Sequence, residues 1–207
     1  MKNLKTRISV YLIGLFIMAI GIGLSVKSDL GVSPVSSIPY TMTCVWGIEM
    51  GKATIFFHTA LVLLQLLLLR GAFQPIQLLQ IPVGVIFGYY TTFSNYLFSF
   101  LPTPQGLPVR LCMMVGSAFF IALGIFLYLP AELPPLAGEG AMQAVSQVTG
   151  ITFSKVKIGF DCAMVMISAA VCICLLRRPG SVGFGTILAA VLVGGFLGLL
   201  TRTFRKH

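Results

Sequence analysis

Two ionisable side chains lie inside apolar runs long enough to cross a lipid bilayer. Asp161 follows Phe160 in a run that reaches Leu176, and His58 lies in another run that ends at Leu69. Ionisable residues within membrane spans are rare and mark ion or substrate pathways. An Asp and a His together could relay a proton or hold a cation. The alternative is a structural polar contact between helices, or an Asp that reaches interfacial water.

The composition makes a bilayer the relevant solvent. The chain has 207 residues, of which 57% are hydrophobic and 9% charged, and its mean hydropathy is +0.98. Soluble domains carry about 25% charged residues. We therefore expect a multi-pass α-helical protein with one integral membrane domain, residues 1–207. The net charge of +9 does not indicate nucleic-acid binding, because the basic residues flank the apolar runs and do not alternate with aromatic residues.

About six transmembrane helices are predicted from the apolar runs and the residues that interrupt them. Their expected bounds are 8–26, 53–69, 76–101, 109–129, 158–176 and 182–201. Pro130 is expected to stop the fourth helix, and Arg177-Arg178-Pro179 the fifth. The first run is interpreted as a helix that stays in the mature protein, because no signal-peptidase-like site follows it.

The basic residues predict that both termini lie in the cytoplasm, because cytoplasmic loops carry an excess of Lys and Arg. With that orientation, nine basic residues fall inside and five outside. The inside group is Lys2, Lys5, Arg7, Arg70, Lys155, Lys157, Arg202, Arg205 and Lys206, and the outside group is Lys27, Lys52, Arg110, Arg177 and Arg178.

The two halves of the chain repeat one another. A shift of 103 residues aligns 14–62 with 117–165 without a gap and gives 14 identities in 49 positions. After a further short shift, two glycines of the third helix match two of the sixth, namely Gly84 with Gly194 and Gly88 with Gly198. Because each half has three helices, the second half must cross the membrane in the opposite direction. We therefore predict an all-α membrane fold of two inverted repeats, residues 8–101 and 109–201, a plan that recurs in secondary transporters.

Each half also contains a Pro-, Gly- and Ser-rich segment between its first two helices. The two segments are 27–52 and 130–155. Each is predicted to hold a short half-helix that is re-entrant or interfacial. In the first, Ser33 can cap the helix and Pro34 can take its first position. Gly47 and Gly150 are the expected stops, and paired interruptions of this kind indicate a binding site.

Eight residues are candidates for binding a substrate or an ion. They are Asp161, His58, Asp29, Ser33, Ser36, Ser37, Glu132 and Glu139. Asp29 and Glu132 could instead cap the start of the short helix that follows each of them. The serines could equally satisfy backbone carbonyls, whereas Glu139 stands between two glycines. Lys52 and Lys155 are expected to extend toward the membrane surface, although an anion-binding role stays open.

Several stretches resemble the bacterial YczE/YitT-type integral membrane proteins. They are "LGVSP", "GIEMGK", "GEGAMQAVSQVTGITFSKVKIGFD" and "RRPGSVGFGTILAAVLVGGFLG". The resemblance covers nearly the whole chain and implies a location in the bacterial cytoplasmic membrane; the family is poorly characterised, so no activity is implied. Members often carry an acid soon after the LG-x-x-P motif, where this chain has Val35, Ser36 and Ser37.

These features predict a small-solute carrier that interacts with the lipid bilayer and a small molecule or ion. The competing hypothesis is an accessory or scaffold protein that supports another membrane or biosynthetic system. A carrier predicts a polar cavity between the repeats, whereas an accessory protein predicts a dry core and an exposed polar or small-residue face. No enzyme, metal or cofactor is expected, because catalytic motifs and ligand clusters are missing from the sequence. A homodimer is compatible with this pattern, and the cysteines are expected to pack as small apolar residues.

Overall fold

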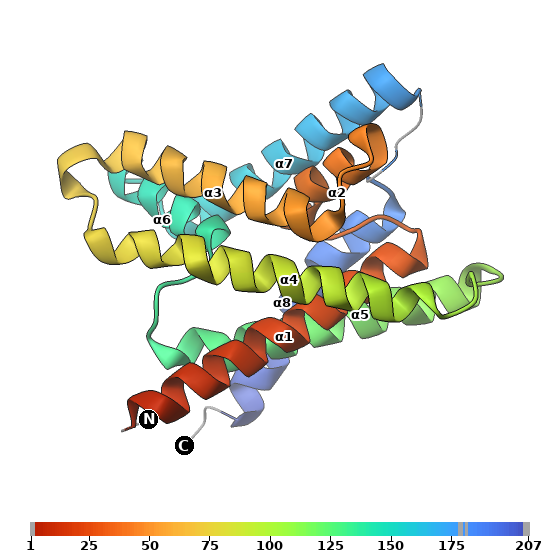
Figure 1. The fold of residues 1–207 in the computed structure, drawn as a ribbon, viewed down its shortest axis with the longest axis horizontal. Helices are drawn as coiled ribbons and strands as arrows, with labels where there is room; N and C mark the ends of the chain where they lie inside the picture. Colours follow the sequence, from red (N-terminus) through yellow and green to blue (C-terminus); the bar gives the residue numbers. More distant parts are fainter. Residues whose placement is uncertain (1–2, 178–179, 181, 205–207) are drawn as a thin grey trace.

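The protein is helical throughout the residues described by the computed structural model, which are 3–177, 180 and 182–204. No strand occurs in this part of the chain. The eight α-helices are α1 (Leu4–Ser28), α2 (Pro34–Trp46), α3 (Met50–Leu69), α4 (Gln80–Ser99), α5 (Leu107–Tyr128), α6 (Ala137–Thr149), α7 (Phe153–Leu176) and α8 (Phe184–Phe204) (Figure 1). The first turn of α1 and the last turn of α8 lie at the same end of the molecule (Figure 1).

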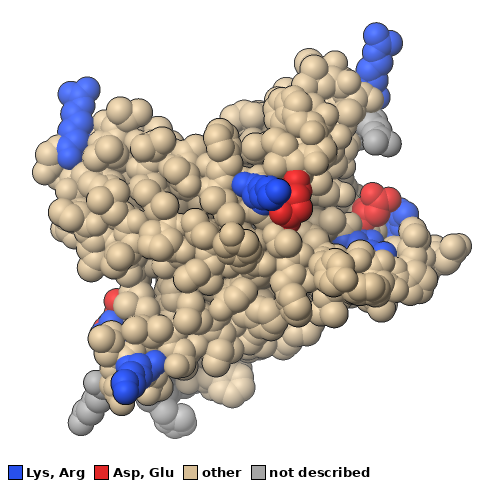
Figure 2. All heavy atoms as spheres, in the orientation of Figure 1, with Lys and Arg blue, Asp and Glu red and all other residues tan. Residues whose placement is uncertain are grey.

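Six of these helices are long and apolar enough to cross a membrane, as the sequence predicts. α2 and α6 have 13 residues each, and about 20 are needed to span a bilayer. They are therefore the two predicted short helices. The outer surface carries many exposed large apolar side chains, and Figure 2 shows few charges on the face in view. The chain is thus a multi-pass membrane protein.

The predicted helix bounds hold within a few residues, with one consequential exception. α7 begins at Phe153 rather than at the predicted residue 158, so Lys157 lies within the helix and not in the preceding loop. The predicted stop at Arg178-Pro179 and the terminal charges Lys2, Arg205 and Lys206 lie outside the described residues.

The two short helices begin and end largely as their sequences dictate. Pro34 takes the first position of α2, where its missing N–H costs nothing. Gly47 ends α2 and Gly150 ends α6, with φ of 66° and 70°, a left-handed conformation that glycine adopts without strain. Ser33 is the residue before α2, but its side chain makes no capping bond there.

The predicted role of two acids as helix-start caps is wrong. Asp29 has a left-handed backbone at the end of α1, and Glu132 has one at the end of the short 3-10 turn Leu129–Ala131. The residues that precede α2 and α6 are Ser33 and Leu136 instead. Each acid pairs with an arginine from the other half: Glu132 with Arg7 at 3.3 Å, and Asp29 with Arg110 at 3.1 Å. The shift of 103 residues relates these two pairs to each other.

The centre of the fold is the contact between α1 and α5, which pack along each other. A Cβ on Gly14 would lie 2.9 Å from the carbonyl oxygen of Gly124, and one on Gly21 would lie 2.8 Å from that of Ser117. Small residues therefore let the two backbones approach closely. Gly14 matches Ser117 and Gly21 matches Gly124 in the repeat, so the two contacts are reciprocal.

The remaining helices surround this pair in matching positions. α4 packs on α1 as α8 packs on α5, and α2 packs on α7 as α6 packs on α3. In one such contact, the buried Ser168 donates a hydrogen bond to Ser37 at 2.9 Å. In the matching contact, a Cβ on Gly140 would lie 2.7 Å from Gln65. The inverted orientation of the halves in the membrane stays a prediction.

Candidate functional site

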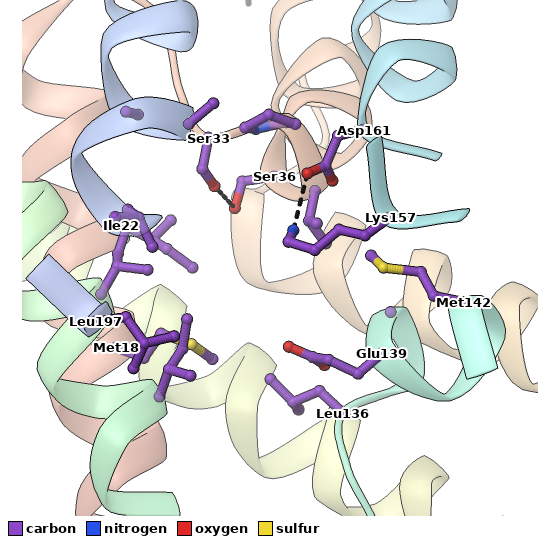
Figure 3. Close-up of a pocket in the computed structure, with 18 of the residues that line it drawn as sticks. Met18, Ile22, Ser33, Ser36, Leu136, Glu139, Met142, Lys157, Asp161 and Leu197 are labelled. Carbon is purple, nitrogen blue, oxygen red and sulfur yellow. Dashed lines mark hydrogen bonds and ion pairs between the residues drawn. The ribbon is translucent and has the colours of Figure 1, made fainter. Parts of the chain in front are cut away.

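A cavity of about 450 Å³ lies between the two halves, and all eight helices contribute to its wall. The short helices α2 and α6 both reach it, as the paired interruptions of the sequence predict (Figure 3). Most of the wall is apolar, from residues such as Ile22, Ile125 and Leu197. A shallower surface hollow beside Gln143, Ser146, Gln147 and Phe153 contains no ionisable side chain.

Six of the polar residues that line the cavity form three pairs related by the sequence repeat. Adding 103 to each number takes Ser36 to Glu139, Thr54 to Lys157 and His58 to Asp161, and all six residues line the cavity. The first half contributes the serine, threonine and histidine, and the second half contributes the two acids and the lysine. The cavity therefore contains matched positions whose charges differ.

Asp161 forms an ion pair with Lys157, one turn earlier on α7. The Lys157 Nζ and Asp161 Oδ2 atoms are 2.8 Å apart, with the Lys side chain 50% exposed and the Asp side chain 20% exposed. No hydrogen bond or ion pair joins Asp161 to His58 in the described chain, and their joint role in proton relay or cation binding stays a prediction. The two residues share one cavity.

His58 is held against α4 by close packing. Its ring stacks on Phe87, with centroids 5.6 Å apart and planes at 23°. A Cβ on Gly84 would lie 3.1 Å from the Cβ of His58, so the glycine favours this close approach. His58 is 4% exposed, which leaves its imidazole in contact with protein and the cavity alone.

Three buried polar atoms of the cavity wall have no hydrogen-bond partner within the described chain. They are His58 Nδ1, the Tyr128 hydroxyl and Asp161 Oδ1. The Tyr128 hydroxyl interacts electrostatically with Glu139 but makes no hydrogen bond of normal geometry. Buried polar groups are nearly always satisfied by protein, water or a ligand. Because these atoms converge on one cavity, water or a solute in that cavity is left as their partner.

Glu139 extends from α6 into the open space, away from the Lys157–Asp161 pair (Figure 3). It forms no ion pair in the described part of the chain. Burial within the protein raises the pKa of the Glu139 carboxyl group above its usual range.

The cavity unites five of the eight predicted binding residues: Asp161, His58, Ser33, Ser36 and Glu139. Ser33 donates to Ser36 at 3.1 Å. Ser37 instead points into the contact between α2 and α7, where it bonds to Pro34 and Ser168. Asp29 and Glu132 lie in the ion pairs at the helix ends, with side chains 68% and 82% exposed. No group of three or more metal-type ligands occurs in the described chain.

Four polar residues of the cavity lie outside the eight predicted candidates: Lys157, Thr54, Tyr128 and Gln143. Lys157 had been placed in a loop, and Thr54 and Tyr128 carried no signal of their own. The repeat could have identified Lys157 and Thr54, because the shift of 103 residues aligns them with each other. Thr54 lies four residues before His58, and Lys157 lies four residues before Asp161. Tyr128 can be recognised as a cavity residue only from the packing of α5 on α1, where its ring centroid lies 5.7 Å from that of Tyr11.

Comparison with known proteins now places the chain in a family. A family of unknown function, DUF6198, matches residues 5–202. The chain belongs to this family. It is also 26% identical over 194 residues to the "Uncharacterized membrane protein YczE" of Bacillus subtilis (strain 168), covering 93% of this chain and 84% of that protein. The YczE-type resemblance is therefore confirmed, and no solved structure gives a significant match.

Proposed function

We propose that the protein is a carrier of small solutes in the bacterial cytoplasmic membrane, with both termini in the cytoplasm, and that it is not an enzyme. The observation that carries this proposal is the cavity between the halves, on which the unpartnered polar atoms of His58, Tyr128 and Asp161 converge. A cavity of this volume, mostly apolar with a few converging polar groups, is typical of small-molecule sites.

The glycines of the two halves support a moving carrier. In the first half, α3 and α4 touch: a Cβ on Gly88 would lie 2.3 Å from Ile55 and 2.8 Å from the carbonyl oxygen of Gly51. The repeat-equivalent glycine, Gly198 on α8, has nothing within 4 Å of such a Cβ. α7 and α8 do not pack along each other. A carrier with alternating access would close this α7–α8 gap and open the α3–α4 contact in its other state.

Filling the cavity is a direct test of the carrier. Gly194 lines the cavity, and a Cβ there meets nothing within 4 Å. Gly195, its neighbour on α8, is just as open but does not line the cavity. Gly194→Phe should occupy the site without a clash, and Gly195→Phe is the matched control. Both replacements also remove a glycine from a helix, so their effect on helix propensity is the same.

The measurement is thermal stabilisation of the purified protein by a broad panel of metabolites and ions. A ligand at 100 times its dissociation constant should add about 2.7 kcal/mol to the stability. We expect at least one solute to stabilise the wild type and Gly195→Phe but not Gly194→Phe. If no solute stabilises the wild type, or if Gly194→Phe responds like Gly195→Phe, the cavity is not the site of a carrier.

The accessory-protein hypothesis has one observation in its favour. The open glycines Gly195 and Gly198 lie on an exposed stretch of α8, where a second membrane helix could pack closely. In that case Gly195→Phe, and not Gly194→Phe, should cause the loss of function in cells. The same matched pair therefore separates the two hypotheses.

A further inference from the structure

The cavity has one acid more than its basic side chain can neutralise. Of its charged residues, Lys157 is held by Asp161 at 2.8 Å, which leaves Glu139 without an ion pair in the described chain. The titratable groups that interact with Glu139 come from three helices: Tyr11 on α1, Tyr128 on α5, and Lys157 and Asp161 on α7. The two tyrosines supply no positive charge near neutral pH.

An isolated carboxylate inside a membrane protein is too costly to remain charged and alone. Such a group either takes up a proton or acquires a positive partner. Glu139 faces the open cavity (Figure 3), the Tyr128 hydroxyl that interacts with it is neutral, and Lys157 is already paired with Asp161. A positive partner must therefore enter the cavity as a solute.

The walls favour an organic cation over a metal ion. The cavity is large and mostly apolar, and its two acids are not part of any group of three or more metal-type ligands in the described chain. Phe87 and Phe153 also line it, and aromatic faces attract ammonium groups. An apolar body with one positive charge matches both features.

We propose that the cavity binds a monovalent organic cation with an apolar body, such as an aryl or alkyl amine, and that the Glu139 carboxyl group holds either this cation or a proton. When the cation enters, the Glu139 O–H bond breaks, one proton leaves, and the carboxylate pairs with the ammonium group, so the charge of the site is unchanged. The proposal rests on the proposed function for the existence of the site and adds the class of its solute.

The test uses three soluble probes that share one ring and differ in charge. Benzyltrimethylammonium is a permanent cation, benzyl alcohol is neutral and benzenesulfonate is an anion. Binding to the purified full-length protein is measured by isothermal titration calorimetry in buffers of different ionisation enthalpy, which reports protons released. We expect only the cation to bind, more tightly as the pH rises, with release of up to one proton at a pH where Glu139 is protonated.

Two isosteric variants separate the role of Glu139 from a general charge effect. Glu139→Gln should weaken binding of benzyltrimethylammonium on the order of a hundredfold, as for the loss of one desolvated charge pair. Glu132→Gln makes the same chemical change outside the cavity and should bind like the wild type. If Glu139→Gln does not fold, proton release by the wild type still tests the proposal, and its absence at every pH would overturn it.

The other outcomes distinguish this inference from the proposed function. If benzyl alcohol or benzenesulfonate binds as well as the cation, and Gly194→Phe blocks that binding, the cation class is wrong and the solute site stands. If none of the probes binds and the metabolite panel gives no stabilisation, both the inference and the carrier fail.

Discussion

The α3–α4 pair and the α7–α8 pair occupy matching places in the repeat, yet only the first is packed. Within the apolar stretch of each membrane span, 44% of the residues are buried in the span that contains α3, and 11% are buried in α7. Gly84 and Gly88 on α4 lie against His58 and Ile55, whereas their equivalents Gly194 and Gly198 on α8 face open space. The second half thus retains the small residues of an interface that it does not form in this structure.

This difference explains where the cavity lies. In the first half, His58 is covered by Phe87 of α4. In the second half, the equivalent residue Asp161 faces the cavity that separates α7 from α8 (Figure 3). Both residues line the cavity, but α4 packs along α3 beside His58, whereas α8 does not pack along α7 beside Asp161. The proposed carrier would use this difference by moving one half against the other.

The largest expected effect comes from breaking the packed pair. Gly88→Leu would force its Cβ into Ile55 and the carbonyl of Gly51, and overpacking of a close contact costs about 3 kcal/mol. Gly198→Leu makes the same change where nothing lies within 4 Å and should gain up to about 1 kcal/mol from helix propensity. Thermal unfolding in detergent measures both. Equal destabilisation by the two variants would contradict the contrast between the halves.

The next effect concerns the charged member of the polar pair. Asp161→Asn leaves Lys157 without its partner in a partly buried position, and we expect a loss of about 1–2 kcal/mol. Adding Lys157→Met to Asp161→Asn should restore most of it, because both charges are then gone. Chemical denaturation of the two single variants and the double variant gives the coupling energy. A coupling near zero would show that the pair is not a unit.

A smaller effect is the pH dependence that Glu139 confers. Because burial raises the pKa of Glu139 in the folded protein, the folded state binds more protons than the unfolded state between the two pKa values. Stability from this group is present below the unfolded value of about 4.3 and is lost as the pH rises through the folded pKa. The melting temperature of the wild type should therefore fall with rising pH more than that of Glu139→Gln. Parallel pH profiles would count against a buried, protonated Glu139.

The smallest effects are expected at the two ion pairs near the ends of α1 and α5, Arg7–Glu132 and Arg110–Asp29. Exposed pairs contribute about 0–1 kcal/mol, so Arg7→Gln and Arg110→Gln should both be mild. Arg7 also donates to the carbonyl oxygen of Ala131 at 2.8 Å, so its loss should be the larger of the two. Thermal unfolding of the two variants at low salt measures the difference. A greater loss from Arg110→Gln would contradict this ranking.

Much of this arrangement could be predicted from the sequence. The six spans follow from apolar length, and the short helices from Pro34, Gly47 and Gly150, because these signals act locally. The repeat register also brought together residues far apart in the chain, including Asp161 and His58. The assignment of all eight binding candidates stays a prediction until a ligand is found.

The sequence could not predict which side chains and which helices contact one another. Lys157 pairs with Asp161 only because α7 begins earlier than its hydropathy indicates, and the two residues then lie one turn apart. The sequence offers the same kind of small residue at Gly88 and Gly198, and only tertiary packing makes one a contact and leaves the other open. The difference between the halves is therefore a property of the assembled fold.

The most direct measurement is a disulfide across the unformed contact. Ile158 and Gly198 are the repeat equivalents of Ile55 and Gly88, which touch. In a background without the native cysteines, we expect Ile158→Cys with Gly198→Cys to cross-link on oxidation, since the closed state brings the two Cα atoms within about 7 Å. Bound solute should change the rate, and the cross-linked protein should no longer be stabilised by that solute. If this pair cross-links no faster than Ile158→Cys with Gly195→Cys, with and without solute, the gap between α7 and α8 does not close and the central claim is wrong.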